Sequence, residues 1–524
     1  MEKAESGVNT GFTLRIAIIV ALGGFLMGFD ASVISGVVTF IEPEFSLTKI
    51  ELGWAVASLT LTATLAMMLA GPLSDRFGRK PVLSAAAVIF AISAVASAFA
   101  PTFTWLVVAR MLGGFGVGAA LIVAPMYIAE VAPAAIRGRM VSINQLNIVV
   151  GISAAFFSNY CVLQLAQSDI SWVQALGLSE WTWRWMLGLE TLPAVIYFCG
   201  LFFVPESPRW LAMQGRHKEA LAVLERVSDA PEAELASVQQ SLEASDTDSK
   251  RLPLKELFSA PMRWVISIGL VVAVLQQITG INSVFFYAPM IFEQSGIGTD
   301  SAFMQAVLVG LTNLVFTLAA MALIDKLGRK PLLSFGVGGI AACMFLLAYG
   351  FGSATYTLQG ATLAKLPELA EVPTLQAMVG TTFSSDLDFK AALNTALGSE
   401  QAGAYEAQLL TASVTMNPTL ILVGILGFVA CFAISLGPVM WVLFSELFPN
   451  RIRALAISFV GLVNSAVSFL VQLVFPWELA NIGNAGTFAI YGGFALVGLF
   501  AISRLLPETK GKSLEELEGM LVRG

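Results

Sequence analysis

Residues 75–84 read DRFGRKPVLS, and residues 325–334 read DKLGRKPLLS. The second copy begins 250 residues after the first, and each copy joins the second and third apolar runs of its half of the chain. A basic decapeptide that recurs at the same place in two sets of apolar runs indicates a duplicated unit of six helices.

A second echo supports the duplication. AEVAPAAIR at residues 129–137 corresponds to SELFPNRIR at residues 445–453, with an offset of 316 residues because an insertion lies between the two copies. Duplicated transporters bind their substrates where the two halves meet, so we expect a site at that interface.

The composition favours a membrane protein. Of the 524 residues, 12% are charged and 56% are hydrophobic, and the mean hydropathy is +0.78. An ordinary soluble protein carries about 25% charged residues. The apolar side chains exceed what a water-soluble core can bury, so lipid is the expected solvent for most of the chain.

The cysteine and histidine content excludes several kinds of catalyst. Cys161, Cys199, Cys343 and Cys431 are far apart in apolar runs, and His217 is the one histidine. This set fits neither a zinc site nor a Ser/His/Asp hydrolase. We therefore expect no enzymatic activity, no metal, no cofactor and no nucleic-acid partner.

Twelve apolar runs reach the length of about 20 residues that a helix needs to cross the bilayer. They lie near residues 14–38, 53–73, 81–100, 104–129, 140–163, 184–203, 264–292, 303–325, 331–352, 418–445, 453–477 and 486–506. The predicted fold is an all-α membrane protein of twelve transmembrane helices in two pseudo-symmetric halves.

The basic loops set the orientation. Lys and Arg concentrate in the short loops 75–80, 135–139, 325–330 and 450–453, all on one side of the predicted membrane. The positive-inside rule makes this side cytoplasmic, and an even number of spans places both termini there.

Two polar insertions interrupt the spans. Residues 205–263 contain RHKEALAVLERV, whose apolar spacing predicts a cytoplasmic helical linker between the halves 1–204 and 264–506. Residues 353–417 are predicted to lie outside and are acidic, and their role is not evident from the sequence. Residues 507–524 form a short cytoplasmic tail.

These motifs resemble the major facilitator superfamily, and within it the sugar porter family. The resemblance covers nearly the whole chain and rests on five motifs in the expected order: GPLSDRFGRK (71–80), PESPRWL (205–211), QQITGIN (276–282), DKLGRK (325–330) and PETKGKS (507–513). It implies a transporter for a monosaccharide that works by alternating access.

Three ionisable residues fall at the same predicted depth. Asp30, Arg110 and Glu190 all lie about 10 Å below the outer interface, as judged from the helical rise. Ionisable groups at such depth usually mark a pathway, so this trio is the predicted proton-coupling site. In the family, proton symporters carry a carboxylate at the Asp30 position and facilitators carry Asn. The alternative is a static ion pair, and Glu190 has structural and coupling roles equally open to it.

Neutral amides and one aromatic ring are the predicted sugar ligands, because sugar hydroxyls both donate and accept hydrogen bonds. The resemblance matches these residues to sugar-contacting positions of the family: Gln145, Gln276, Gln277, Asn282, Asn313, Trp441 and Asn464. Hydrogen bonds between helices, worth about 0.6 kcal/mol each, are the alternative role for such amides.

Three positions depart from the common family pattern. Ile152 stands where the family's xylose symporter has Gln, Phe286 replaces a common Tyr, and Ser465 replaces a Trp. The pocket is therefore altered, and the identity of the sugar stays open.

The basic loops also contain acids, which orientation alone does not explain. The resemblance assigns these residues to a cytoplasmic gate of salt bridges and helix-end charges: Asp75, Arg79, Glu130, Arg137, Asp325, Arg329, Glu446 and Arg453.

The sequence thus predicts a monomeric, proton-coupled monosaccharide symporter of a bacterial inner membrane, whose partners are the sugar, protons and the lipid bilayer. An uncoupled facilitator of the same fold is the nearest alternative. A sugar sensor that does not transport is a second, although such receptors usually carry long cytoplasmic tails.

Overall fold

The structure is a computed structural model that describes residues 10–133, 136–247, 257–364, 366–449 and 452–508. The chain divides into two compact units. The first unit comprises residues 1–31, 58–155 and 184–253, and the second comprises residues 32–57, 156–183 and 254–524. The ends of several helices of the first half therefore pack with the second half.

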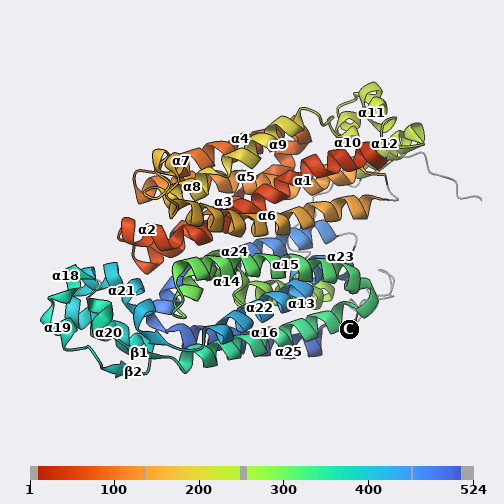
Figure 1. Ribbon diagram of the computed structural model, residues 1–524. Coiled ribbons are helices and arrows are strands. Elements are labelled where there is room, and N and C mark those ends of the chain that lie inside the picture. The colour runs from red at the N-terminus through yellow and green to blue at the C-terminus, as the bar shows by residue number, and fades with distance from the viewer. Residues whose placement is uncertain (1–9, 134–135, 248–256, 365, 450–451, 509–524) are drawn as a thin grey trace, which may run out of the picture. The chain divides into compact units, whose positions relative to one another are not determined.

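Long helices make up most of the first half of the chain (Figure 1). Their bounds are α1 (Thr10–Val33), η1 (Ile34–Gly36), α2 (Val38–Glu44), α3 (Lys49–Phe77), α4 (Arg79–Ala98), α5 (Phe103–Val131), α6 (Arg137–Ala166), α7 (Ser171–Ala175), α8 (Thr182–Gly188) and α9 (Thr191–Leu201).

The predicted sixth span, 184–203, is interrupted between α8 and α9. Pro193 has no N–H for the carbonyl of Leu189, which accepts a hydrogen bond from the Leu192 N–H at 3.1 Å instead. The two pieces are each too short to count as a span, so eleven helices of the described residues satisfy length and hydropathy together. The interruption places Glu190 at the junction.

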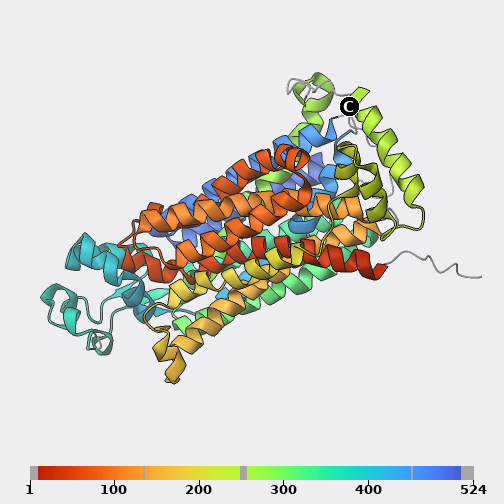
Figure 2. The same ribbon diagram turned by 90° about the horizontal axis from the view of Figure 1, so that it is seen from above.

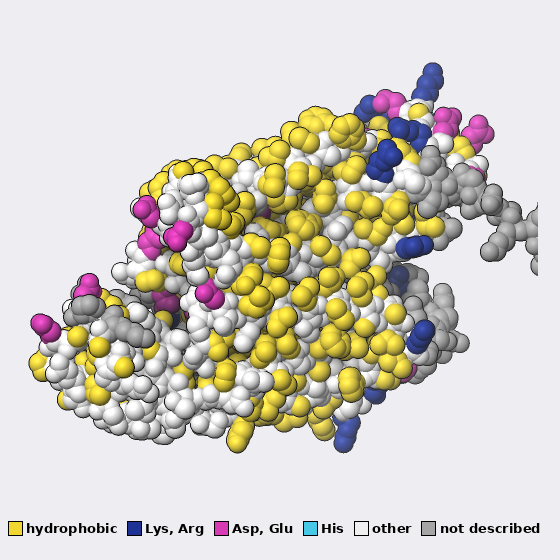
Figure 3. All heavy atoms as spheres, viewed as in Figure 1, with side chains coloured by type: hydrophobic (Ala, Val, Ile, Leu, Met, Phe, Trp, Pro, Cys, Tyr) yellow, Lys and Arg dark blue, Asp and Glu magenta, His cyan; other side chains and the backbone are white. Residues whose placement is uncertain are grey.

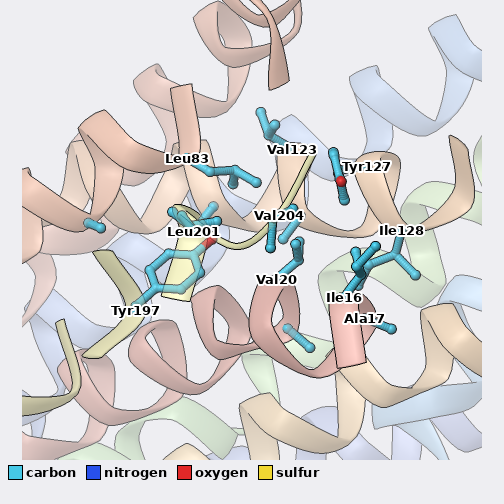
Figure 4. Packing of buried hydrophobic residues seen from close by; sticks show 14 of the residues in the cluster. Ile16, Ala17, Val20, Leu83, Val123, Tyr127, Ile128, Tyr197, Leu201 and Val204 are labelled. Atoms are coloured by element: carbon cyan, nitrogen blue, oxygen red, sulfur yellow. The ribbon is translucent and has the colours of Figure 1, made fainter. Parts of the chain in front are cut away.

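The core of the first unit is apolar and closely packed. Val20 on α1, Leu83 on α4, Val123 on α5 and Leu201 on α9 are all fully buried, and Figure 4 shows their side chains converging. Glycines let α3 and α5 approach, since a Cβ on Gly118 would lie 2.2 Å from the backbone oxygen of Ala63. With Gly114 it forms a GxxxG pair, a common contact in membrane helices.

The linker of the first unit forms three helices, α10 (Pro208–Met213), α11 (His217–Leu224) and α12 (Pro231–Thr247), which pack around Leu211 and Ala220. Figure 2 shows them gathered at the end of the unit where α1 begins. The Arg226 guanidinium lies over the Phe12 ring at 4.0 Å, which ties the linker to α1.

The second half repeats the pattern with two broken helices. Its helices are α13 (Ala260–Ile278), α14 (Ile281–Glu293), α15 (Thr299–Leu327), α16 (Arg329–Gly352), α22 (Pro418–Ile434), α23 (Leu436–Leu447), α24 (Arg453–Asn481) and α25 (Asn484–Leu505). One break lies at Thr279–Gly280. The other lies at Ser435, and Pro438 follows in the first turn of α23, where a proline needs no N–H.

Residues 353–417 form a small domain of their own, which we call the outer subdomain after its predicted side of the membrane. Strands β1 (Thr355–Thr357), β2 (Thr382–Phe383) and β3 (Val414–Thr415) form an antiparallel sheet in the order β2-β1-β3. Its helices are α17 (Gly360–Leu363), α18 (Pro367–Ala370), α19 (Pro373–Gln376), α20 (Asp386–Leu397) and α21 (Ser399–Ser413). Tyr356, Phe389 and Leu409 are buried in its core.

The surface fits a lipid environment. In Figure 3, hydrophobic side chains cover most of the visible sides of the helices, and charged side chains lie mainly toward the helix ends. Exposing residues such as Phe203, Phe335 and Val497 to water would cost free energy, whereas their exposure to hydrocarbon is favourable.

Gly118→Val should destabilise the first unit, because two methyl groups and a Cβ would enter the 2.2 Å contact with Ala63. We expect a loss of about 1–3 kcal/mol, the usual cost of overpacking, seen as a lower melting temperature in detergent micelles. Gly493→Ala is the control, since its Cβ would meet nothing within 4 Å. Equal melting temperatures for the two variants would contradict the close contact.

Candidate functional site

A network of amide side chains lies in the second unit, on both sides of the break between α13 and α14. Asn464 on α24 donates to Gln276 Oε1 at 2.8 Å, and Gln277 donates to Asn464 Oδ1 at 3.2 Å. Asn282 donates to Gln277 Oε1 at 2.8 Å. The structure therefore brings together four of the predicted sugar ligands: Gln276, Gln277, Asn282 and Asn464.

The break itself depends on Gly280. Its φ of 86° lies in the left-handed region, and a Cβ there would lie 2.5 Å from the Tyr491 ring. The turn brings the first residues of α14 back beside the last turn of α13. As a result, Asn282 reaches Gln277 although helical spacing alone would not pair them.

Two members of the network were not predicted. Ser468 Oγ accepts hydrogen bonds from Asn282 at 2.7 Å and from Gln472 at 2.8 Å. With Asn464, these residues form a polar line at every fourth position of α24, so they share one helix face. That spacing was visible in the sequence and could have identified both residues.

The other predicted sugar ligands lie outside the network. Asn313 on α15 is buried, and no hydrogen-bond partner is found for it in the described ranges. Trp441 on α23 is 48% exposed and meets Phe444 edge to face. Gln145 belongs to the first unit and is exposed, whereas its neighbour Asn144 is buried.

The predicted ionisable trio lies inside the first unit. Arg110 Nη1 is 3.4 Å from Asp30 Oδ1, and Nη2 is 3.4 Å from the backbone oxygen of Asp30. Glu190 is also buried and interacts electrostatically with both. The structure thus brings the three predicted residues together.

The hydrogen bonds of the trio are incomplete. Within the part of the chain that the structure describes, no partner is found for Asp30 Oδ2, Arg110 Nε or Glu190 Oε1, although all three atoms are buried. Buried charged groups without full pairing are costly. The ionised trio carries two negative charges against one positive, and one added proton would make it neutral.

Gly113 on α5 makes room for the Asp30 carboxylate and was not predicted. A Cβ at this position would lie 2.9 Å from Asp30 Oδ2 and 2.5 Å from Ser93 Oγ. Ser93 in turn donates to the backbone oxygen of Ala109 at 2.8 Å. A larger residue at position 113 would therefore displace the carboxylate.

Three of the predicted gate residues of the first half form one ion cluster. Arg79 donates to Glu130 at 2.8 and 2.9 Å and pairs with Asp75 at 2.9 Å. Glu130 also accepts from the Ser207 hydroxyl at 2.6 Å, which attaches the linker to the cluster.

The second half repeats part of this arrangement. Arg329 pairs with Glu446 at 2.7 Å, and the side chain of Asp325 lies outside the described residues. Arg137 and Arg453 each bind a backbone oxygen. The Nε atoms donate to Ala132 at 3.4 Å and to Phe448 at 3.0 Å, so each cation lies at the end of the preceding helix, where it complements the dipole.

Glu206 and Glu508 complete these clusters and were missed, although both lie in motifs singled out from the sequence. Glu206 accepts from the backbone N–H groups of Arg79 and Lys80 at 3.0–3.3 Å, and Glu508 accepts from those of Arg329 and Lys330 at 3.1 Å. Each carboxylate therefore caps the first turn of a helix, α4 or α16. Burial raises the pKa of Glu206, against the opposing effect of its N–H donors.

Gly78 and Gly328 explain why both caps follow a glycine. Their φ angles are 101° and 93°, and added Cβ atoms would lie 2.5 Å from Glu206 Oε2 and 2.9 Å from Glu508 Oε2. The repeated GRK sequence therefore encodes the same turn, cap and arginine in both halves.

Comparison with known proteins identifies the family of this chain. The family model described as "Sugar (and other) transporter" matches residues 16–364 and 395–521. The arabinose-proton symporter of Bacillus subtilis (strain 168) is 34% identical over 521 residues, covering 98% of this chain and 96% of its own. The D-xylose-proton symporter of Escherichia coli (strain K12) is 33% identical over 547 residues, with coverage of 98% and 96%.

Solved structures agree with these relatives. The inward-open conformation of the xylose transporter XylE from E. coli matches with a TM-score of 0.72 and 31% identity, covering 97% of this chain and 99% of that one. Its partially occluded inward-open conformation matches with a TM-score of 0.71 and 30% identity, covering 96% and 100%. The predicted twelve-helix fold is thereby confirmed. The chain belongs to the sugar porter family of the major facilitator superfamily, and it is a multi-pass membrane transporter rather than an enzyme.

Proposed function

We propose that this protein is a proton-coupled monosaccharide symporter of a bacterial inner membrane, with both termini in the cytoplasm. The observation that carries the proposal is the buried trio of Asp30, Arg110 and Glu190, whose charges are incompletely paired. The arabinose-proton and D-xylose-proton symporters among its relatives support it.

The proton acts on the trio through charge balance. Arg110 is attracted to two carboxylates, and protonation of Asp30 removes one of those attractions. Asp30 Oδ2 is buried and has no partner in the described part of the chain, so this oxygen is available to take up a proton. A change in this pairing between helices α1 and α5 alters the relative energies of the outward-open and inward-open forms, and so couples the proton to transport.

The sugar is bound through the amide network. Gln276 and Gln277 hydrogen bond to each other and to Asn464, and Asn282 donates to Gln277. Sugar hydroxyls can replace these bonds one for one, since each hydroxyl both donates and accepts. Asn313 contributes a buried amide, and the half-exposed ring of Trp441 contributes an apolar face. We also propose Gln145 as a ligand.

The ion clusters at the basic loops act as the cytoplasmic gate. In each unit they join helix ends through an arginine, Arg79 or Arg329, that binds a carboxylate at the end of another helix. Such pairs are partly buried and geometrically specific, so they favour one arrangement of the helix ends. We infer that they re-form differently as the gate opens, with Asp75, Glu130, Arg137, Asp325, Glu446 and Arg453 as the other members.

Asp30→Asn should abolish accumulation while sugar exchange continues, because the amide cannot take up or release the proton. The measurement is uptake of labelled glucose, xylose and arabinose into proteoliposomes with and without an inward proton gradient. We expect the wild-type protein to concentrate its sugar and the variant to reach only equal concentrations on the two sides.

Asp169→Asn is the matched control for this experiment, since Asp169 is an exposed acid in a loop. It should accumulate sugar like the wild type. Equal equilibration by the wild-type protein with or without the gradient would make it a facilitator. Binding of sugar without any flux would identify a sensor.

Ser468→Ala should weaken sugar binding by about fivefold, since it removes the hydroxyl that accepts hydrogen bonds from Asn282 and Gln472 and orients Asn282. The measurement is the dissociation constant from tryptophan fluorescence in detergent. Ser267→Ala is the control, because that hydroxyl bonds only to the backbone of its own helix. If both variants bind sugar like the wild type, Ser468 does not position the site.

A further inference from the structure

The outer subdomain contributes no residue to the transport site described above. It is nevertheless folded and makes specific contacts with the membrane helices. Its core is separate, with Tyr356, Leu375, Phe389 and Leu409 buried together. Strands β1 and β3 pair directly after α16 and directly before α22, so the two connections to the membrane helices are held side by side.

A buried ion pair fastens the subdomain to the turn between α24 and α25. Asp386 and Lys390, one helical turn apart on α20, are only 6% and 7% exposed, and they approach to 3.4 Å. Asp386 Oδ2 accepts from the backbone N–H and the side-chain amide of Asn484 at 3.2 and 3.3 Å. Lys390 donates to the backbone oxygen of Leu479 at 3.2 Å.

This arrangement satisfies two helix ends at once. The carboxylate lies at the N-terminus of α25 and the ammonium lies at the C-terminal turn of α24, which is the favourable sign at each end. Gly483 allows the close approach, since its φ is 84° and a Cβ would lie 2.9 Å from Asp386 Oδ1. Because both charges are buried and each binds a helix end, we expect the subdomain to stay with α24 and α25 during transport.

A second contact of the subdomain is a partly exposed ion pair. Lys49, in the first turn of α3, lies 2.6 Å from Glu42 on α2 and 3.5 Å from Glu406 on α21. The side chains of Lys49 and Glu406 are 33% and 18% exposed. Such a pair is worth little and is easily exchanged for water.

A small open pocket lies beside this pair. It is lined by Lys49, Lys390, Glu406 and Gln294, with apolar residues such as Leu52 and Pro476. The Oε1 atom of Gln294 is buried and has no hydrogen-bond partner in the part of the chain described. A contact with an unmet hydrogen bond beside an opening separates at lower cost than a close-packed core.

Close contact continues below the pair, along α3 and α24. A Cβ on Gly53 would lie 1.9 Å from the backbone oxygen of Leu473, and Trp54 packs edge to face on Phe469 at 5.7 Å. These residues, with α2 and the start of α3, belong to the same compact unit as the second half of the chain. The outer end of α3 is therefore packed against α24 in this structure.

We propose that the outer subdomain is a fixed part of the transporter's outer gate, and that the Lys49–Glu406 ion pair is the latch that holds α2 and α3 against it. The Asp386–Lys390 clamp keeps the subdomain on α24 and α25, while the latch closes when the outer side is shut and parts when it opens. This inference rests on the proposed alternating-access function. It concerns the opening of the outer side and is independent of proton coupling and of the identity of the sugar.

The test is a distance measurement by pulsed electron paramagnetic resonance on the full-length protein in lipid nanodiscs. Spin labels are attached at Ser46→Cys, beside the start of α3, and at Ala377→Cys in the subdomain, after replacement of the four native cysteines. Both labelled positions are exposed. Glu406→Gln should raise the ratio of long to short distances by about two- to fivefold, the range expected for loss of a partly exposed ion pair.

Glu406→Lys should raise the ratio further, because it places two cations together. Glu371→Gln is the matched control, an exposed acid of the same subdomain that should leave the ratio unchanged. Elution as a single species and retained sugar binding show that each variant is folded. A ratio that is the same in Glu406→Gln, Glu406→Lys and Glu371→Gln overturns the latch.

Failure of the proposed function gives different results. If Asp30→Asn still accumulates sugar while Glu406→Gln shifts the distances, the latch stands and proton coupling by Asp30 fails. If a single distance is found in every variant, with and without sugar, alternating access at this end fails and the latch fails with it.

Discussion

The constraint behind the whole structure is that hydrocarbon offers no partner to a polar group. Every backbone N–H and C=O within the bilayer must be satisfied internally, which restricts the spans to helices. The same constraint forces buried side chains to gather, so Gln276, Gln277, Asn282 and Asn464 bond to one another rather than to lipid. The lipid environment therefore favours the gathering of these amides into one network.

Incomplete satisfaction marks the places that are proposed to change during transport. The trio of Asp30, Arg110 and Glu190 leaves three buried atoms without partners within the described chain. By contrast, the Arg79 guanidinium binds Glu130 through two hydrogen bonds. A group that must take up a proton needs such an unfilled hydrogen-bonding position, and the trio offers it among three ionisable side chains.

Two kinds of ion pair, buried and partly exposed, lie at the ends of the helices. Buried pairs that also cap helices, such as Asp386–Lys390 with α24 and α25, are costly to break and define rigid bodies. Partly exposed pairs such as Lys49–Glu406 add little energy and can exchange with water. The duplicated caps of Glu206 on α4 and Glu508 on α16 are half-buried carboxylates that bind backbone N–H groups at helix ends. Their matching geometry gives both halves the same rigid element at the basic loops.

Hydropathy, span length and a repeated motif were enough to predict that the chain lies in lipid, and to predict its class of fold, its duplication and its family. The sequence also identified the ionisable trio, since the depth of Asp30, Arg110 and Glu190 follows from counting residues along helices. Glu206, Glu508 and Ser468 escaped notice because their partners are distant in sequence, although the motifs and the spacing along α24 contained signals. The breaks in the helices became visible only in the tertiary structure, at the junction of α8 and α9 and at Ser435. The same holds for the ion pairs of Asp386 with Lys390 and of Lys49 with Glu406. The physical reason is that hydropathy and helical rise are properties of single segments. Breaks, caps and ion pairs depend on which segments pack together.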